Sequence, residues 1–318
     1  MGICQFCHRS AGLFRSAHRE CLRRFEQARQ QLLDLLRVCF EEGREVSEQH
    51  ESIMRLCREG RLDEAALGAA CAEALDAAIL RYLRVGPISP EENELIARFI
   101  DYTGLPQSLL NAHHSLERLV QAQILRDLLA GSPPQCRLTT EGDIPVELQA
   151  GETLLWLAGN VLCCRQELPA APAARRGASP EEGSQPGVSQ ADSQTTSQSG
   201  APTPCPCTRE GRPMGRGIYY PVDCCDAPPP DEKGLQPLGQ GLAALSDKAL
   251  YFASPTQQLR LPYAGLTEVL PCRAGVSFRE GRDESLLFFS GLDPWFCLNL
   301  ASNLMRPAAR TAEAGAPA

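Results

Sequence analysis

The sequence lacks any long uninterrupted apolar run. Nothing in its 318 residues approaches the roughly 18 apolar residues that a membrane-spanning helix needs. Its N-terminus carries cysteine, histidine and arginine where a secretory signal has an apolar core. We therefore expect a cytoplasmic protein that is not embedded in a membrane.

The sequence also has fewer positively charged than negatively charged residues. The chain has 31 lysines and arginines against 39 aspartates and glutamates, which gives a net charge of −8. The protein as a whole therefore has no field that attracts nucleic acid or anionic lipid. Because Arg260, Arg273, Arg279 and Arg282 are scattered through the C-terminal part, we rank lipid low among the expected partners.

Enzyme motifs are missing from the sequence. It has five histidines, and they assemble no Ser/His/Asp or Cys/His set. Neither a phosphate-binding glycine loop nor a dinucleotide fingerprint is found. We therefore expect a protein that is not an enzyme.

Cysteine, in contrast, is plentiful. The fifteen cysteines lie in a long chain without an export signal, so we expect most of them to be reduced thiols. Cys39, Cys57 and Cys71 fall on apolar helical faces and are predicted to be small core residues.

Two pairs of cysteines and histidine near the N-terminus have the spacing of a metal site. Cys4-x-x-Cys7 is followed, after ten residues, by His18-x-x-Cys21. Such paired soft ligands suit tetrahedral Zn²⁺, and a knuckle this small would take its folding energy from the metal. His8 is an alternative ligand, but its adjacency to Cys7 favours His18. With four protein ligands the predicted site is structural and not catalytic.

Arginines surround this knuckle. Against them stand only Glu20 and Glu26, so the first thirty residues are locally basic. Nucleic-acid binding through the knuckle is therefore an alternative function, although a solvated helix face explains the same charges. The arginines are Arg9, Arg15, Arg19, Arg23, Arg24 and Arg29.

A second group of cysteines leaves two interpretations open. We expect the adjacent residues to alternate between core and surface on strands. A second metal site or a redox or hydrolytic enzyme site is the less favoured alternative. The group consists of Cys163, Cys164, Cys205, Cys207, Cys224 and Cys225.

The region from 25 to 134 is predicted to be helical. Apolar residues recur near a 3.6-residue period from His18 to about Gly43, and less regularly over 47–58 and 62–83. Ser89-Pro90-Glu91-Glu92 predicts a capping box with a helix from Pro90 that stops at Gly104. A further helix is expected from Pro106 or Ser108 through Leu129, with His113 and His114 at ordinary helical positions.

Strand patterns replace the helical period after Pro134. They predict an antiparallel barrel over 138–166 and 214–306 that ends in a helix capped by Asp293, in an α+β fold. The composition of 167–213 predicts a disordered insert, and 307–318 a disordered tail. The expected strands cover 144–148, 153–164, 217–222, 241–245, 249–252, 258–261, 266–271, 275–279 and 285–290.

The segments Gly151–Trp156, Gly217–Tyr220 and Gly241–Phe252 resemble the bacterial pleckstrin-homology-like and GRAM-like domains. The order of knuckle, helical region and barrel is similar to that of a family of uncharacterised bacterial proteins. The resemblance implies a fold that hosts lipid, peptide and purely structural roles. Together with the closed metal site, it favours an interaction or regulatory protein that binds a protein or peptide partner.

Overall fold

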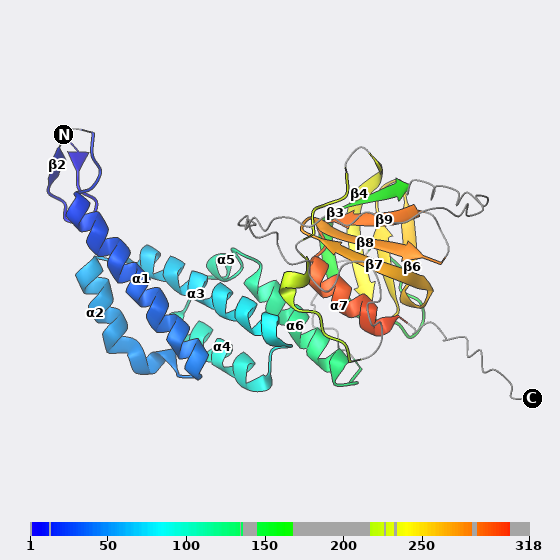
Figure 1. Cartoon of the computed structure of the whole chain (residues 1–318), viewed down its shortest axis with the longest axis horizontal. Helices are drawn as coiled ribbons and strands as arrows, with labels where there is room; N and C mark the ends of the chain where they lie inside the picture. Colours follow the sequence, from blue (N-terminus) through cyan, green and yellow to red (C-terminus); the bar gives the residue numbers. More distant parts are fainter. Residues whose placement is uncertain are drawn as a thin grey trace, which may run out of the picture.

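The computed structural model describes residues 2–12, 14–133, 135, 145–167, 217–225, 227–231, 234–281 and 285–305. A small two-stranded hairpin leads into a set of helices, and an antiparallel sheet curled into a half-barrel follows, which makes the fold α+β (Figure 1). The predicted insert and tail lie outside the described residues, apart from Glu167. Among the described residues, no helix has the length and apolar character to cross a membrane.

The N-terminal half consists of the hairpin and six helices, with one 3₁₀ turn. The apolar periodicity correctly predicts the three long helices α1, α2 and α3, whose apolar faces pack together with buried Leu32, Leu36, Ile53, Leu75 and Ile79. The elements are β1 (Gly2–Ile3), β2 (Ser10–Gly12), α1 (Arg19–Glu42), η1 (Val46–Gln49), α2 (His50–Gly60), α3 (Glu64–Val85), α4 (Pro90–Thr103), α5 (Gln107–Leu110) and α6 (Ser115–Leu129).

The capping box predicted at the start of α4 is confirmed. The Ser89 hydroxyl accepts a hydrogen bond from the Glu92 amide at 3.1 Å, and the Glu92 carboxylate accepts one from the Ser89 amide at 2.8 Å. Pro90 occupies the first helical position, and Gly104 ends the helix with φ of 57°. Local sequence therefore fixes both ends of this helix.

The single helix expected from Pro106 or Ser108 to Leu129 is wrong. The chain instead forms the short α5 and then α6, and His113 and His114 lie in the turn between them. His114 has φ of 60°, and its ring lies 3.1 Å from the Glu117 carboxylate. The Ser115 hydroxyl donates to Asp76 of α3 at 2.7 Å. These polar contacts fix the break.

Seven antiparallel strands form the half-barrel in the order β6-β5-β4-β3-β9-β8-β7. The first strand of this set, β3, pairs with both β4 and the last strand, β9, and α7 packs against β7 and β8. The elements are β3 (Leu154–Glu167), η2 (Val222–Cys225), β4 (Leu235–Ser246), β5 (Ala249–Ala253), β6 (Gln258–Pro262), η4 (Tyr263–Gly265), β7 (Leu266–Cys272), β8 (Gly275–Glu280), β9 (Ser285–Ser290) and α7 (Pro294–Leu304).

Two of the expected strands are not strands in the structure. Residues 145–149 form bends and irregular chain, with Ile144 outside the described residues, and residues 217–221 form irregular chain before η2. The backbone of the second segment bonds to side chains of α7 instead of a neighbouring strand: the amides of Gly217 and Ile218 donate to Asn303 at 2.8 and 3.2 Å. A side-chain partner therefore replaces the ladder that the pattern predicted.

The helices and the half-barrel share one apolar core. Trp295 and Phe296 of α7 are buried in the same cluster as Leu83 of α3 and Leu125 of α6. The Tyr219 hydroxyl donates to the Leu83 carbonyl at 2.7 Å across this junction. Figure 1 shows α7 beside α6, at the place where the two parts meet.

Candidate metal centre

The hairpin and the start of α1 bring the four predicted ligands together. Cys4 and Cys7 lie in the turn between β1 and β2, where the Cys4 amide donates to the Arg9 carbonyl and the His8 amide to the Cys4 carbonyl, both at 2.8 Å. His18 is the N-cap of α1, and Cys21 lies in its first turn. Figure 1 shows the hairpin at the end of α1 that is remote from the half-barrel.

The four ligand atoms converge. One ligand atom from each of Cys4, Cys7, His18 and Cys21 lies within 4.8 Å of the other three. The Nδ1 atom of His18 is 3.3 Å from the Cys7 sulfur and 3.8 Å from the Cys21 sulfur. Zinc–sulfur bonds of about 2.3 Å in a tetrahedron place ligand atoms somewhat under 4 Å apart. The cluster is therefore compatible with Zn²⁺.

The second ring nitrogen of His18 defines how the imidazole is held. Its Nε2 atom lies 2.9 Å from the Ser10 carbonyl. Since a carbonyl only accepts, Nε2 carries the proton and Nδ1 presents its lone pair to the three sulfurs. This hydrogen bond fixes tautomer and ring orientation, as is usual for histidine ligands of metals.

The backbone around Cys4 favours its thiolate. Burial raises the pKa of this thiol, but the amides of His18, Cys7 and Phe6 point at the sulfur and lower the pKa more, to about 6. Burial raises the pKa of Cys21, as do its hydrogen bonds to the sulfurs of Cys7 and Cys4. The cluster therefore holds one preformed anion that suits a cation.

The knuckle contacts the helices that follow it in the chain. Arg61 donates from Nη1 to the Phe6 carbonyl at 2.7 Å, and the Phe6 ring packs on Phe25 of α1 with centroids 4.9 Å apart. A Cβ atom at Gly2 would lie 2.0 Å from the Arg15 carbonyl oxygen, so this position requires glycine. His8, the alternative ligand, is exposed on the hairpin and lies outside the cluster.

The hairpin and the segment that leads from it into α1 carry exposed apolar and basic side chains. We call Ile3, Arg9, Phe14, Arg15 and Arg19 the knuckle tip. Phe14 is fully exposed and Ile3 is 66% exposed. The three arginines of the tip are exposed and form no ion pair with any residue that the structure describes.

The remaining arginines of the basic N-terminus have acidic partners. Arg23 and Arg24 both bind the Glu20 carboxylate, each with a shortest distance of 2.9 Å, and Arg29 pairs with Glu73 of α3. The sequence pattern alone presents these three as free bases. Partners that lie one helical turn away, or on another helix, reduce the positive charge that these arginines present to an anion.

The second cysteine group does not assemble a metal cluster within the described residues. Cys163 and Cys164 are both buried on β3, so the expected alternation between core and surface is wrong there, because the sheet is covered on both faces at this point. Cys224 and Cys225 are both buried, and Cys224 is disulfide-bonded. Cys205 and Cys207 lie outside the described residues. Cys39, Cys57 and Cys71 are buried free thiols, as predicted.

Comparisons with known proteins add no relative: no family model, curated protein or solved structure matches the chain. The site therefore stands on its own geometry. Sequence reasoning missed two of its features, the Ser10 carbonyl behind His18 and the full exposure of Phe14. The exposure of Phe14 had a weak signal in the sequence, because this residue lies between a glycine-containing segment and Arg15. Nothing in the sequence indicated the role of the Ser10 carbonyl.

Proposed function

We propose that the protein is a non-enzymatic interaction protein whose N-terminal knuckle, ordered by structural zinc, presents a recognition surface to a protein partner. The observation that carries this proposal is the knuckle tip, where Phe14 and Ile3 are exposed. Exposed apolar side chains that are rimmed by polar ones mark interaction sites, and aromatic residues with arginine are frequent binding hot spots.

The role of zinc in this proposal is structural. Three thiolates and one imidazole would fill a tetrahedral coordination shell and leave no position for water or substrate. The hairpin has two very short strands and few buried residues of its own, so metal binding would supply the energy that orders the tip. A cytoplasmic location belongs to the proposal, since a reducing compartment keeps the ligand cysteines unpaired, although Cys224 is disulfide-bonded in the structure.

We further propose that the half-barrel is pleckstrin-homology-like. In support, it is a seven-stranded antiparallel sheet in which the first strand, β3, pairs with the last, β9. An apolar helix, α7, follows directly and packs on the sheet. This fold commonly binds proteins and peptides, and in this chain it would provide a second binding surface.

The test first compares how the zinc-loaded parent protein and its Phe14→Ala variant capture a protein partner. The captured partner is then purified, and its affinity for each of the two proteins is measured directly. Val85→Ala is the matched control, because Val85 is also highly exposed, at 88%, but lies at the end of α3. We expect Phe14→Ala to weaken binding at least tenfold, as hot-spot truncations do, and Val85→Ala to bind normally. Equal affinities of the two variants would contradict the proposal.

Nucleic acid is the second candidate partner. The three arginines of the tip form no ion pair among the described residues, and the same N-terminal segment carries an exposed aromatic ring, Phe14, that can stack on a base. Binding to single-stranded RNA or DNA would then fall steeply with salt. Replacing Arg9, Arg15 and Arg19 by glutamine would reduce the slope of log K against log salt by about two, or roughly 0.7 for each phosphate that is no longer neutralised. A salt-independent affinity would exclude this candidate.

A further inference from the structure

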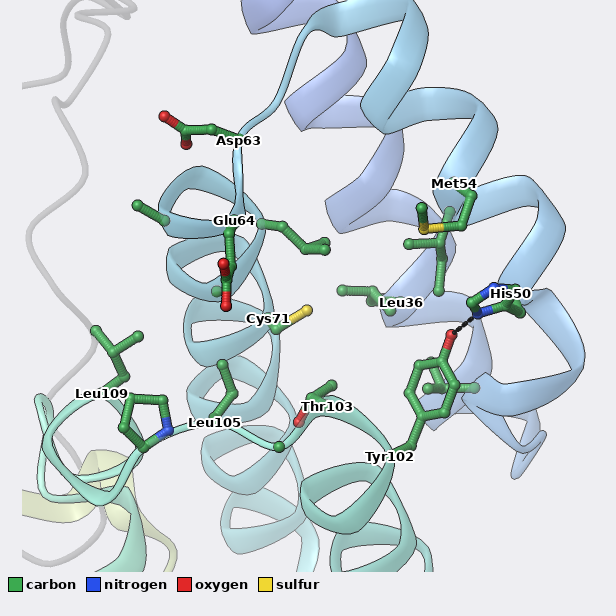
Figure 2. Close-up of a pocket in the computed structure, with 17 residues that line it drawn as sticks. Leu36, His50, Met54, Asp63, Glu64, Cys71, Tyr102, Thr103, Leu105 and Leu109 are labelled. Carbon is green, nitrogen blue, oxygen red and sulfur yellow. Dashed lines mark hydrogen bonds between the residues drawn. The ribbon is translucent and has the colours of Figure 1, made fainter.

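A groove opens among the helices of the N-terminal half, and none of the metal ligands lines it. It has a volume of about 690 Å³ and lies between α2 and α3, with the turn from α4 to α5 at one end (Figure 2). Buried Leu36, Ile53 and Cys71 line its floor, and half-buried Leu67 and Leu105 its sides. Pockets that hold small ligands have volumes of about 300 to 1,000 Å³ and a mostly apolar lining.

The groove has a polar end. His50 at the start of α2 and Tyr102 in the last turn of α4 close it with a hydrogen bond of 2.7 Å between Nδ1 and the hydroxyl (Figure 2). Both side chains are exposed, Tyr102 to 37%. A ligand that enters the groove therefore meets hydrogen-bonding groups at this end and carbon atoms along the floor.

A basic cleft continues from this end of the groove. The cleft has a volume of about 450 Å³ and shares His50 and Met54 with the groove, and Arg55 and Arg58 also line it; all of its lining residues lie on α2. Neither arginine forms an ion pair with a residue in the described ranges. Glu51 also lines the cleft, so two guanidinium groups face one carboxylate there.

The opposite wall of the groove is acidic. Asp63 and Glu64 line it at the start of α3, across from Met54 (Figure 2). An anionic group would be repelled at that wall and attracted to Arg55 and Arg58. An anionic head is therefore favoured beside Arg55 and Arg58 and disfavoured beside Asp63 and Glu64.

We propose that this groove binds an amphiphilic acid, with the apolar chain on the floor between α2 and α3 and the anionic head in the cleft of Arg55 and Arg58. Met54, which is 42% exposed, lies between the two compartments and contacts the chain where it meets the head. An unbranched methionine adapts to chains of different shape. The site lies outside the knuckle and the half-barrel, so it adds a small-molecule ligand to the proposed function.

The proposal is tested by calorimetric titration of the full-length, zinc-loaded protein with decanoate, decanol and decylammonium, all below their micelle concentrations. We expect one site per chain that binds decanoate most tightly and decylammonium most weakly. Each added methylene from octanoate to decanoate should tighten binding about fourfold, since burying one methylene contributes about 0.8 kcal/mol. Equal affinities for the three heads would overturn the proposal.

Two sets of variants locate the site. Ala65 lines the groove, whereas Ala69, one turn further along α3, is also exposed and does not line it. Ala65→Phe should weaken decanoate binding at least tenfold, and Ala69→Phe should leave it unchanged. Replacing Arg55 and Arg58 by glutamine should weaken decanoate binding about tenfold, as removal of one charged hydrogen bond does, and leave decanol binding unaltered.

The outcomes separate the proposal from other occupants. Saturable binding that Ala65→Phe does not weaken would place the ligand elsewhere and overturn the proposal. Absence of saturable binding by decanoate would also overturn it, and would leave the groove to an amphipathic helix of a protein partner. Circular dichroism of each variant establishes that the helices have formed, so a loss of binding is not a loss of fold.

Discussion

The side chain of Asn299 and the backbone of Tyr220 exchange two hydrogen bonds across 79 residues of sequence. The Tyr220 amide donates to Oδ1 at 2.8 Å, and Nδ2 donates to the Tyr220 carbonyl at 3.0 Å. Asn299 is completely buried on α7, and its Nδ2 also donates to the Trp295 carbonyl at 3.0 Å. One amide side chain thus takes the place of a neighbouring β-strand for this segment.

We predict that Asn299→Ala destabilises the protein strongly. The change removes the Asn299 partner of the buried Tyr220 amide, whereas the Tyr220 carbonyl keeps its hydrogen bond from the Trp295 indole at 3.1 Å. Because losing the partner of one buried group costs about 1 to 3 kcal/mol, the free energy of unfolding in urea should fall by about that amount. Gln107→Ala, a change at an exposed position of α5, is the control and should have no effect.

The metal site predicts a stoichiometry of one zinc per chain in protein purified without added metal. The double change Cys4→Ser and Cys7→Ser should reduce the zinc content, measured by mass spectrometry of the metal, to nearly zero, because two ligands of the cluster are lost. Cys57→Ala, which removes a free thiol from the helical core, should keep its zinc. Zinc retained by the double variant would point to the second cysteine group.

A buried carboxylate predicts how stability depends on pH. Glu152 is 1% exposed and accepts hydrogen bonds from Tyr251 and Arg260 at 2.6 Å and from Ser246 at 3.1 Å. Burial raises its pKa, but these three hydrogen bonds outweigh burial and lower it below the usual value. The carboxylate therefore stabilises the fold above the pKa of the unfolded chain, about 4.3, and this contribution is lost as the pH falls through the folded value.

Glu152→Gln should accordingly be less stable than the parent at pH 7 and should lose less stability on acidification. Urea unfolding at neutral and at acidic pH measures the difference between the two proteins, which we expect to narrow at the lower pH. Glu147→Gln, at a nearby exposed carboxylate, serves as the control for general charge effects. If the free energies of unfolding of the parent and of Glu152→Gln differed by the same amount at every pH, the result would contradict a lowered pKa of Glu152.

Two glycines of the sheet form a matched pair. A Cβ atom at Gly241 of β4 would lie 1.9 Å from the Ala253 carbonyl oxygen of β5, whereas one at Gly159 of β3 would meet nothing within 4 Å. Gly241→Ala should therefore lower the free energy of unfolding by about 1 to 3 kcal/mol, because the strands must separate. Gly159→Ala should be neutral or slightly stabilising, since alanine restricts the unfolded chain. Chemical denaturation of both variants tests the prediction.

The parts of the structure that the sequence predicts are those encoded by neighbouring residues. The ligands of the metal cluster follow from two short spacings, and α4 follows from a capping box and a glycine. The strands β3 to β9 of the half-barrel appear where alternation and turn residues place them. In each case the deciding signals lie within a few residues of one another, so a local pattern is sufficient.

The parts that the sequence does not predict depend on distant partners. Residues 217–221 have a strand-like pattern, but the partner of their backbone is Asn299 or Asn303 on a helix that follows much later in the chain. The groove is assembled from α1, α2, α3 and the turn after α4, and no single segment carries its signature. Likewise, the basic character of the N-terminus could not reveal that Glu73 on another helix pairs with Arg29.

The position of α7 has a consequence for synthesis of the protein. This last described element packs on both the sheet and α6, so it completes the core of the N-terminal helices as well as that of the half-barrel. A ribosome must therefore release α7 before either part can finish folding, although domains commonly fold in order as they emerge. A chain that ends before Asp293 would expose apolar surface in both halves, which makes early termination a hazard for solubility.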